Sequence, residues 1–230
     1  MSESESIRLT SPLAQLYVPP PPDLSSMPPW TVAAWWQIFR IVLAEVIGTM
    51  VLTFVCTAYS GVHGGLVGGA LAGGITLFIM IWQFGSVSGG HVNPAVTLIF
   101  TIQRRLSLLH TLFYFAAQIV GGILGAYIAI AFLPADQVAT RLAGITQPGK
   151  GISPGQALGM EAFSTGVVIL LATLDLDELR RDCDHFRVAL TVGLEVMAFA
   201  LVFVSPVSLK ETFVQSIIML ICIAFEKMFG

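Results

Sequence analysis

The chain has 230 residues, of which 55% are hydrophobic and only 11% are charged, and its mean hydropathy is +0.83. Soluble domains carry about 25% charged residues, so this composition excludes an ordinary soluble domain. The net charge of −3 does not indicate a basic surface for nucleic acid. The three cysteines lack disulfide or metal-ligand spacing, and no metal or other cofactor is expected. Apolar runs of about 18 residues or more instead predict an all-α membrane protein with several spans.

Residues 1–29 differ from the rest of the chain because they are rich in serine and proline. They contain too few apolar side chains to fold, so we expect a disordered, extended tail. A ligand for proline-recognising domains is an alternative, but a plain linker is the simpler interpretation. No basic segment followed by a short apolar core is present, so a cleavable signal peptide is not expected.

Residues 30–204 form the predicted transmembrane domain. Trp30, Trp35 and Trp36 lead into it, as interfacial aromatic residues do. Five apolar runs are expected to span the bilayer, at residues 38–58, 66–84, 108–133, 156–174 and 188–204. Most arginines fall in loops on the same side as the N-terminus, which predicts a multi-pass protein with a cytoplasmic N-terminus. The arginines do not indicate which membrane, and the plasma membrane is the expected one.

The polar, glycine-rich stretch SGGHVNPAVT, from Ser88 to Thr97, lies between two apolar runs at what should be membrane depth. Irregular backbone is tolerated there only when it is buried in protein or lines a water-filled cavity. Asn93 is a good N-cap and Pro94 suits the first helical position, so a helix should begin here and end before Gln103. About ten residues extend over ~15 Å, half of a ~30 Å hydrocarbon core. We therefore predict a re-entrant segment at residues 86–103, whose half-helix points its positive N-terminus at the midplane of a pore.

An internal repeat connects the two halves of the chain. The sequence AEVIGT at residues 44–49 resembles MEAFST at residues 160–165, which suggests an inverted duplication with its pore between the halves. A carboxylate inside a span costs about 2.5–3.5 kcal/mol, so we expect Glu45 and Glu161 each to accept hydrogen bonds from the backbone of a re-entrant loop. Alternatively, each glutamate lies near an interface and its carboxylate reaches water.

The repeat breaks down near the end of the chain. Asn93 follows Glu45 by 48 residues, so its counterpart should lie near residue 209, where the sequence is VSLKE and Asn-Pro-Ala is absent. Residues 212–225 are apolar over only 14 residues, which is short for a span and fits a re-entrant, interfacial or shallowly inserted segment. Residues 205–230 are therefore a divergent C-terminal segment, and the second repeat is incomplete.

The chain resembles the aquaporins, the major intrinsic protein family of channels for water and small solutes. The stretch SGGHVNPAVT matches the family's first pore loop almost letter for letter, and the glutamates at 45 and 161 and the region of Gln118, Gly121 and Gly122 fit its pattern. The resemblance covers residues 38–204. It implies an aquaporin-like bundle of transmembrane helices, a pore in each protomer, and homo- or hetero-tetramers with other aquaporin subunits.

The resemblance also implies roles for the pore loop. Asn93, Pro94 and Ala95 would form the pore end of the half-helix, with the Asn93 amide donating a hydrogen bond to passing water. His91 would line the pore or hold the loop. The helix N-terminus carries roughly half an elementary positive charge, which disfavours protons and other cations but not neutral solutes.

Several positions depart from the family pattern. The family's constriction has an aromatic residue about 20 positions before the pore asparagine, where this chain has Gly73, and a histidine where it has Val196. Both changes imply a wider, less polar filter that admits glycerol or urea as well as water. The family's filter arginine would fall near Glu211, and the neighbouring Lys210 is a weak substitute.

The leading prediction is a passive channel for water and small neutral solutes such as glycerol. A non-conducting, truncated or variant subunit that associates with full-length channels is the alternative, because it would explain the unfamiliar C-terminal segment. A secondary transporter is less well supported, since paired ionisable residues for ion coupling are lacking apart from the two glutamates. An enzyme is not expected, because there is no nucleophile–base set, metal cluster or phosphate-binding loop.

Overall fold

The computed structural model of the chain describes residues 24–26, 31–62, 65–135, 147–148, 151–175, 185–203 and 207–208. Its helices are α2 (Val32–Val62), α3 (Leu66–Ser88), α4 (Pro94–Ile102), α5 (Leu108–Phe132), α7 (Pro154–Asp175) and α8 (His185–Phe203). Two short strands, β1 (Gln147–Pro148) and β2 (Val207–Ser208), pair in antiparallel fashion. Apart from this pair and one isolated bridge, the regular secondary structure of the described residues is helical, as the composition predicted.

Five of these helices, α2, α3, α5, α7 and α8, are long and apolar enough to cross a membrane, which confirms the five predicted spans. Helix α2 begins earlier than the apolar run because the Thr31 hydroxyl accepts a hydrogen bond from the Ala34 N–H at 3.2 Å and caps the helix. Large apolar side chains such as Leu112 and Phe132 are 66% and 77% exposed on the outside of the bundle. Such side chains suit a lipid-facing surface.

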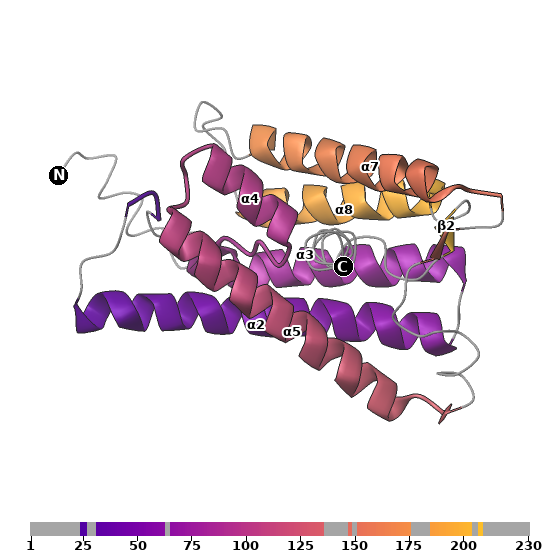
Figure 1. The fold of residues 1–230 in the computed structure, drawn as a ribbon, viewed down its shortest axis with the longest axis horizontal. Coiled ribbons are helices and arrows are strands. Elements are labelled where there is room, and N and C mark those ends of the chain that lie inside the picture. Colours follow the sequence, from indigo (N-terminus) through magenta and orange to yellow (C-terminus); the bar gives the residue numbers. More distant parts are fainter. Residues whose placement is uncertain are drawn as a thin grey trace, which may run out of the picture.

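The helices are arranged so that the half-helix α4 lies between the two halves of the chain. Helices α2 and α3 run side by side, α5 crosses α2 obliquely, and α8 packs along α3 with α7 beside it (Figure 1). Helix α4 contacts α5 of the first half and α7 of the second half. The short helix is therefore positioned by both repeats.

Small residues allow α5 to approach α2 closely. A Cβ added to Gly121 would overlap the Val46 carbonyl oxygen, and one added to Gly125 would overlap the Met50 carbonyl oxygen. Glycine at these positions lets the two backbones touch, as is common between membrane helices. On α7, by contrast, a Cβ added to Gly159 would meet nothing within 4 Å in the described part of the chain.

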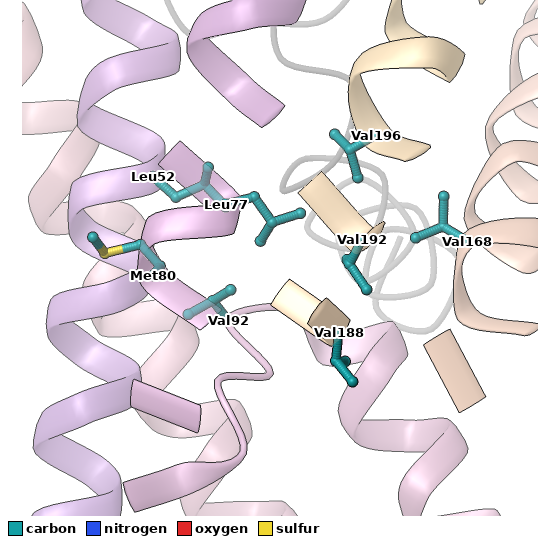
Figure 2. Packing of buried hydrophobic residues seen from close by; sticks show 8 residues of the cluster. All are labelled: Leu52, Leu77, Met80, Val92, Val168, Val188, Val192 and Val196. Carbon is teal, nitrogen blue, oxygen red and sulfur yellow. The ribbon is translucent and has the colours of Figure 1, made fainter. Parts of the chain in front are cut away.

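A buried apolar cluster joins the two halves at the centre of the bundle. Side chains of α2, α3 and the pore loop face side chains of α7 and α8 across it (Figure 2). Its members are Leu52, Leu77, Met80, Val92, Val168, Val188, Val192 and Val196. The β-branched residues of α8 thus form one wall, and this wall faces the half-helix and its loop.

Part of the expected N-terminal tail is folded. The Leu24 carbonyl oxygen accepts a hydrogen bond from the Ser107 N–H at 2.7 Å, and Leu24 forms an isolated parallel bridge with Leu106. Leu24 is buried, so the expectation of a tail without structure does not hold at residues 24–26. Apolar neighbours supplied by distant segments hold this residue, and the local composition did not show them. The other residues of the expected tail, 1–23 and 27–29, lie outside the described residues.

The beginning of the divergent C-terminal segment has an unexpected partner. By the repeat spacing, Val207 and Ser208 correspond to His91 and Val92 of the first half, yet they pair with Pro148 and Gln147 in the connection between α5 and α7. Residues 209–230, including Lys210 and Glu211, lie outside the described residues.

Candidate pore loop and cavity

The pore loop begins where α3 ends, and its glycines are required by the backbone. Gly89 and Gly90 have φ angles of 84° and 62°, in the left-handed region that side chains other than glycine adopt with strain. A Cβ on Gly90 would also come within 2.9 Å of the Ile81 Cα atom. These two residues therefore reverse the chain tightly against α3.

The Glu45 carboxylate is the acceptor on which the loop is built. The His91 and Val92 backbone N–H groups donate to its two oxygens at 3.0 and 2.8 Å. The Ser88 hydroxyl donates at 2.6 Å, and the Gln118 amide donates at 2.8 Å. All four partners are donors, and Glu45 is fully buried, so the arrangement fits an ionised carboxylate. The predicted role of Glu45 as an acceptor for loop backbone groups agrees with this geometry.

Val92 is held in a strained backbone conformation at the turn of the loop. Its φ angle of 39° is unusual for a β-branched residue. Its side chain is completely buried and lies against α2, where a Cβ on Gly48 would come within 2.5 Å of the Val92 Cγ1 atom. The hydrogen bond to Glu45 and this packing together maintain the strain, as is common at functional sites.

The side chain of His91 is fixed inside the loop. Its Nδ1 lies 3.2 Å from the Thr97 hydroxyl, which itself donates to the Asn93 carbonyl oxygen at 3.1 Å. Since that hydroxyl has one proton, Nδ1–H acts as the donor in this arrangement and Nε2 is an acceptor. The His91 ring also contacts the rings of Phe100 and Tyr114, with centroid distances of 4.6 and 4.9 Å.

Helix α5 supplies further hydrogen bonds to the loop and to the carboxylate on which it is built. The Gln118 amide donates to Thr97 at 3.0 Å as well as to the carboxylate of α2. The Tyr114 hydroxyl donates to the Ser88 carbonyl oxygen, and the Tyr114 side chain is completely buried. The resemblance had drawn attention to Gln118, but the sequence reasoning missed Tyr114. A polar aromatic residue one turn before Gln118, on the same helical face, was the available signal.

Helix α4 begins as the sequence predicted. Asn93 is the N-cap, its Oδ1 accepts a hydrogen bond from the Ala95 N–H at 2.8 Å, and Pro94 occupies the first helical position. The helix ends at Ile102, before Gln103. Because Oδ1 bonds the cap, the amide group is the part of this side chain that donates.

A cavity of about 70 Å³ lies between the pore loop and the apolar wall. Since one water molecule needs ~10–15 Å³, the cavity can hold several. One side presents the backbone of Gly89 and Gly90, together with His91 and Asn93. The other lining residues are Leu52, Leu77, Ile81, Val96, Phe100, Val168, Ile169, Ala172, Val188, Val192 and Val196. The cavity thus has one polar edge and otherwise apolar walls.

Of the other predicted site residues, some line the cavity and others do not. Val196 lines the cavity and is 5% exposed. Gly73 is not among the lining residues, and a Cβ there would lie 3.7 Å from the Cys56 sulfur. Glu161 is half-buried on α7, and the segment expected to face it, near residue 209, lies outside the described residues. The structure therefore brings together the loop residues and Val196.

A family model described as Major intrinsic protein matches residues 33–208. The chain belongs to the major intrinsic protein family. It is 32% identical to Aquaporin PIP2-7 of Musa acuminata over 180 residues, and 33% identical to the lens fiber major intrinsic protein of Lithobates pipiens over 165 residues. These matches cover 74% and 70% of this chain, but the chain spans only 63% and 62% of the length of these relatives.

The fold also resembles a solved structure of the family. The aquaglyceroporin of Plasmodium falciparum superimposes with a TM-score of 0.69, covering 82% of this chain and 83% of that one. Its sequence identity to this chain is 23%, so the similarity concerns the fold. The chain is therefore an integral membrane protein with an aquaporin-like fold. Its family is one of channels, not of enzymes.

Proposed function

We propose that this chain forms a passive channel for water and small neutral solutes. The observation that carries the proposal is the cavity beside the pore loop, because its polar edge and apolar walls suit a single file of such solutes. The Asn93 amide would donate to the passing molecule, and backbone groups of Gly89 and Gly90 would accept from it. Few polar contacts mean that a solute is bound weakly enough to leave again.

The half-helix would also set the preference for neutral solutes. The N-terminus of α4 lies at Asn93 on the cavity, and it carries roughly half an elementary positive charge. The free energy of a cation rises as it approaches such a charge, whereas that of a neutral molecule changes little. Pro94 and Ala95 contribute by beginning the helix at this point.

The solutes proposed include glycerol as well as water. Val196 adds an apolar side chain to the cavity wall, and Gly73 adds no side chain at the position expected for an aromatic residue. Val196 makes the cavity wall weakly polar, whereas Gly73 lies outside the cavity lining and would add width only elsewhere along the passage. We further propose that the N-terminus faces the cytoplasm of a plasma membrane protein and that four subunits assemble, each with its own pore.

Osmotic shrinkage and swelling of proteoliposomes, followed by stopped-flow light scattering, tests the channel. We expect the full chain to raise both water and glycerol permeability at least severalfold over empty vesicles. Permeability equal to that of empty vesicles for both solutes would contradict the proposal.

The variant Asn93→Asp tests whether the amide takes part. Aspartate caps helices as well as asparagine does, so α4 should remain folded while the donating amide is lost and a negative charge appears at the cavity. We expect water permeability to fall about tenfold and the far-ultraviolet circular dichroism to stay unchanged. The variant Gln103→Glu is the control, because it adds the same charge at an exposed residue at the other end of the helix.

A further inference from the structure

We propose that Leu24–Ser26 is a strap that holds the half-helix in place and limits the width of the cavity at Phe100. The effect on permeability rests on the proposed channel function, but the restraint on α4 does not. The strap lies at the end of the bundle where α4 ends and α5 begins (Figure 1).

Leu24 attaches the strap to the bundle through its carbonyl oxygen and its side chain. The Leu24 carbonyl oxygen accepts from the Ser107 N–H, and the Leu24 side chain is 7% exposed, whereas Ser25 and Ser26 are exposed. Ser107 is also the N-cap of α5, and only residues 103–107 separate the two helices. The strap is therefore fixed to the short connection that sets where α4 ends.

Phe100 connects the Leu24 side chain to the cavity wall. It belongs to a buried cluster with Ile41, Leu106 and Tyr114, and Phe100 of α4 packs against this cluster. Phe100 also lines the cavity, and its ring lies 4.6 Å from that of His91. Phe100 thus has the cluster on one side and the cavity on the other.

This arrangement predicts the direction of the effect. A smaller residue at position 24 leaves space in the cluster, because interiors are close-packed and relax only partly. The Phe100 ring can then withdraw from the cavity, so the cavity widens. The half-helix also loses part of its restraint at the connection to α5.

The experiment compares Leu24→Ala with Ser26→Ala in the full chain, since Ser26 lies on the same strap but is exposed. Hydrogen exchange of peptides covering residues 100–107 reports the attachment. We expect exchange at the Ser107 amide to become at least tenfold faster in Leu24→Ala, and to stay unchanged in Ser26→Ala. Unchanged exchange in Leu24→Ala would overturn the strap.

Cavity width is measured separately with Val96→Cys, which places a thiol on the cavity wall of α4. We expect a small uncharged thiol reagent to label it at least twofold faster when Leu24→Ala is added. Equal labelling rates would overturn the link between strap and cavity, whether or not the chain conducts. In a conducting chain, glycerol permeability should rise about twofold in Leu24→Ala. If the wild type does not conduct but exchange and labelling respond as expected, the channel function fails and the strap stands.

Discussion

At the scale of single residues, Glu45 explains why an irregular loop can exist inside the bundle. Backbone N–H groups that are buried without partners cost about 1–3 kcal/mol each, and a membrane interior offers no water to replace them. One carboxylate supplies acceptors for two such groups and two side-chain donors. The helix α2 therefore carries the acceptor that the loop cannot supply for itself.

The variant Glu45→Gln should destabilise the protein strongly. The glutamine amide keeps the shape, but its NH₂ group would face N–H or O–H donors, and the charge that strengthens four hydrogen bonds is lost. We expect a loss of about 3 kcal/mol in the free energy of unfolding in detergent, and faster hydrogen exchange at His91 and Val92.

The same substitution at Glu161 is the natural comparison. Glu161 occupies the corresponding repeat position but is only half-buried. Its Oε1 atom is buried, but the side chain as a whole is less enclosed than that of Glu45, so we expect a smaller cost of about 1–2 kcal/mol in the free energy of unfolding. Equal costs at the two glutamates would contradict the idea that burial makes Glu45 distinct.

At the scale of elements, sequence patterns predicted each helix for an identifiable physical reason. Apolar runs of sufficient length located the five spans, and Asn93-Pro94 located the start of α4 because both residues suit a helix N-terminus. The parts that were missed depend on contacts between distant segments. Tyr114 and Leu24 act through partners on other elements, and no local pattern shows which buried group a tyrosine hydroxyl or a leucine will meet.

The contact between α2 and α5 provides a test at this scale. In Gly121→Ala the added Cβ would overlap the main chain of α2, so the two helices must separate. We expect a loss of about 1–3 kcal/mol in the free energy of unfolding, measured by thermal denaturation in detergent.

Gly159→Ala on α7 is the matched control, because a Cβ there meets no described atom within 4 Å. Alanine is a better helix former than glycine, so stability should be unchanged or rise by up to about 1 kcal/mol. A loss as large as that of Gly121→Ala would show that α7 is closely packed on this face as well.

At the scale of the whole molecule, the two halves differ in construction at corresponding positions. In the first half, the residues of the pore loop bind the repeat glutamate. In the second half, the corresponding positions Val207 and Ser208 pair with the connection between α5 and α7. The sequence indicated the departure, because Asn-Pro-Ala does not recur, but it could not indicate this pairing, which depends on polar backbone groups of a distant loop.

The proposed orientation can be tested by labelling with a membrane-impermeant maleimide. In a chain whose three native cysteines are replaced, Gln103→Cys and Ala135→Cys place exposed thiols at opposite ends of α5. We expect intact cells to label Ala135→Cys, and inside-out vesicles to label Gln103→Cys. The opposite pattern would place the N-terminus outside.

The shared carboxylate also has a consequence for the order of biosynthesis. Glu45 and the loop residues leave the ribosome before Gln118 and Tyr114, which complete the loop's hydrogen bonds from α5. At ~5–20 residues per second, roughly 1–5 s separate the synthesis of Asn93 from that of Gln118. During this interval the loop lacks two of its polar partners, so it should remain in the aqueous part of the insertion machinery until α5 arrives. The half-helix is therefore expected to enter the membrane together with α5, and not when its own residues are made.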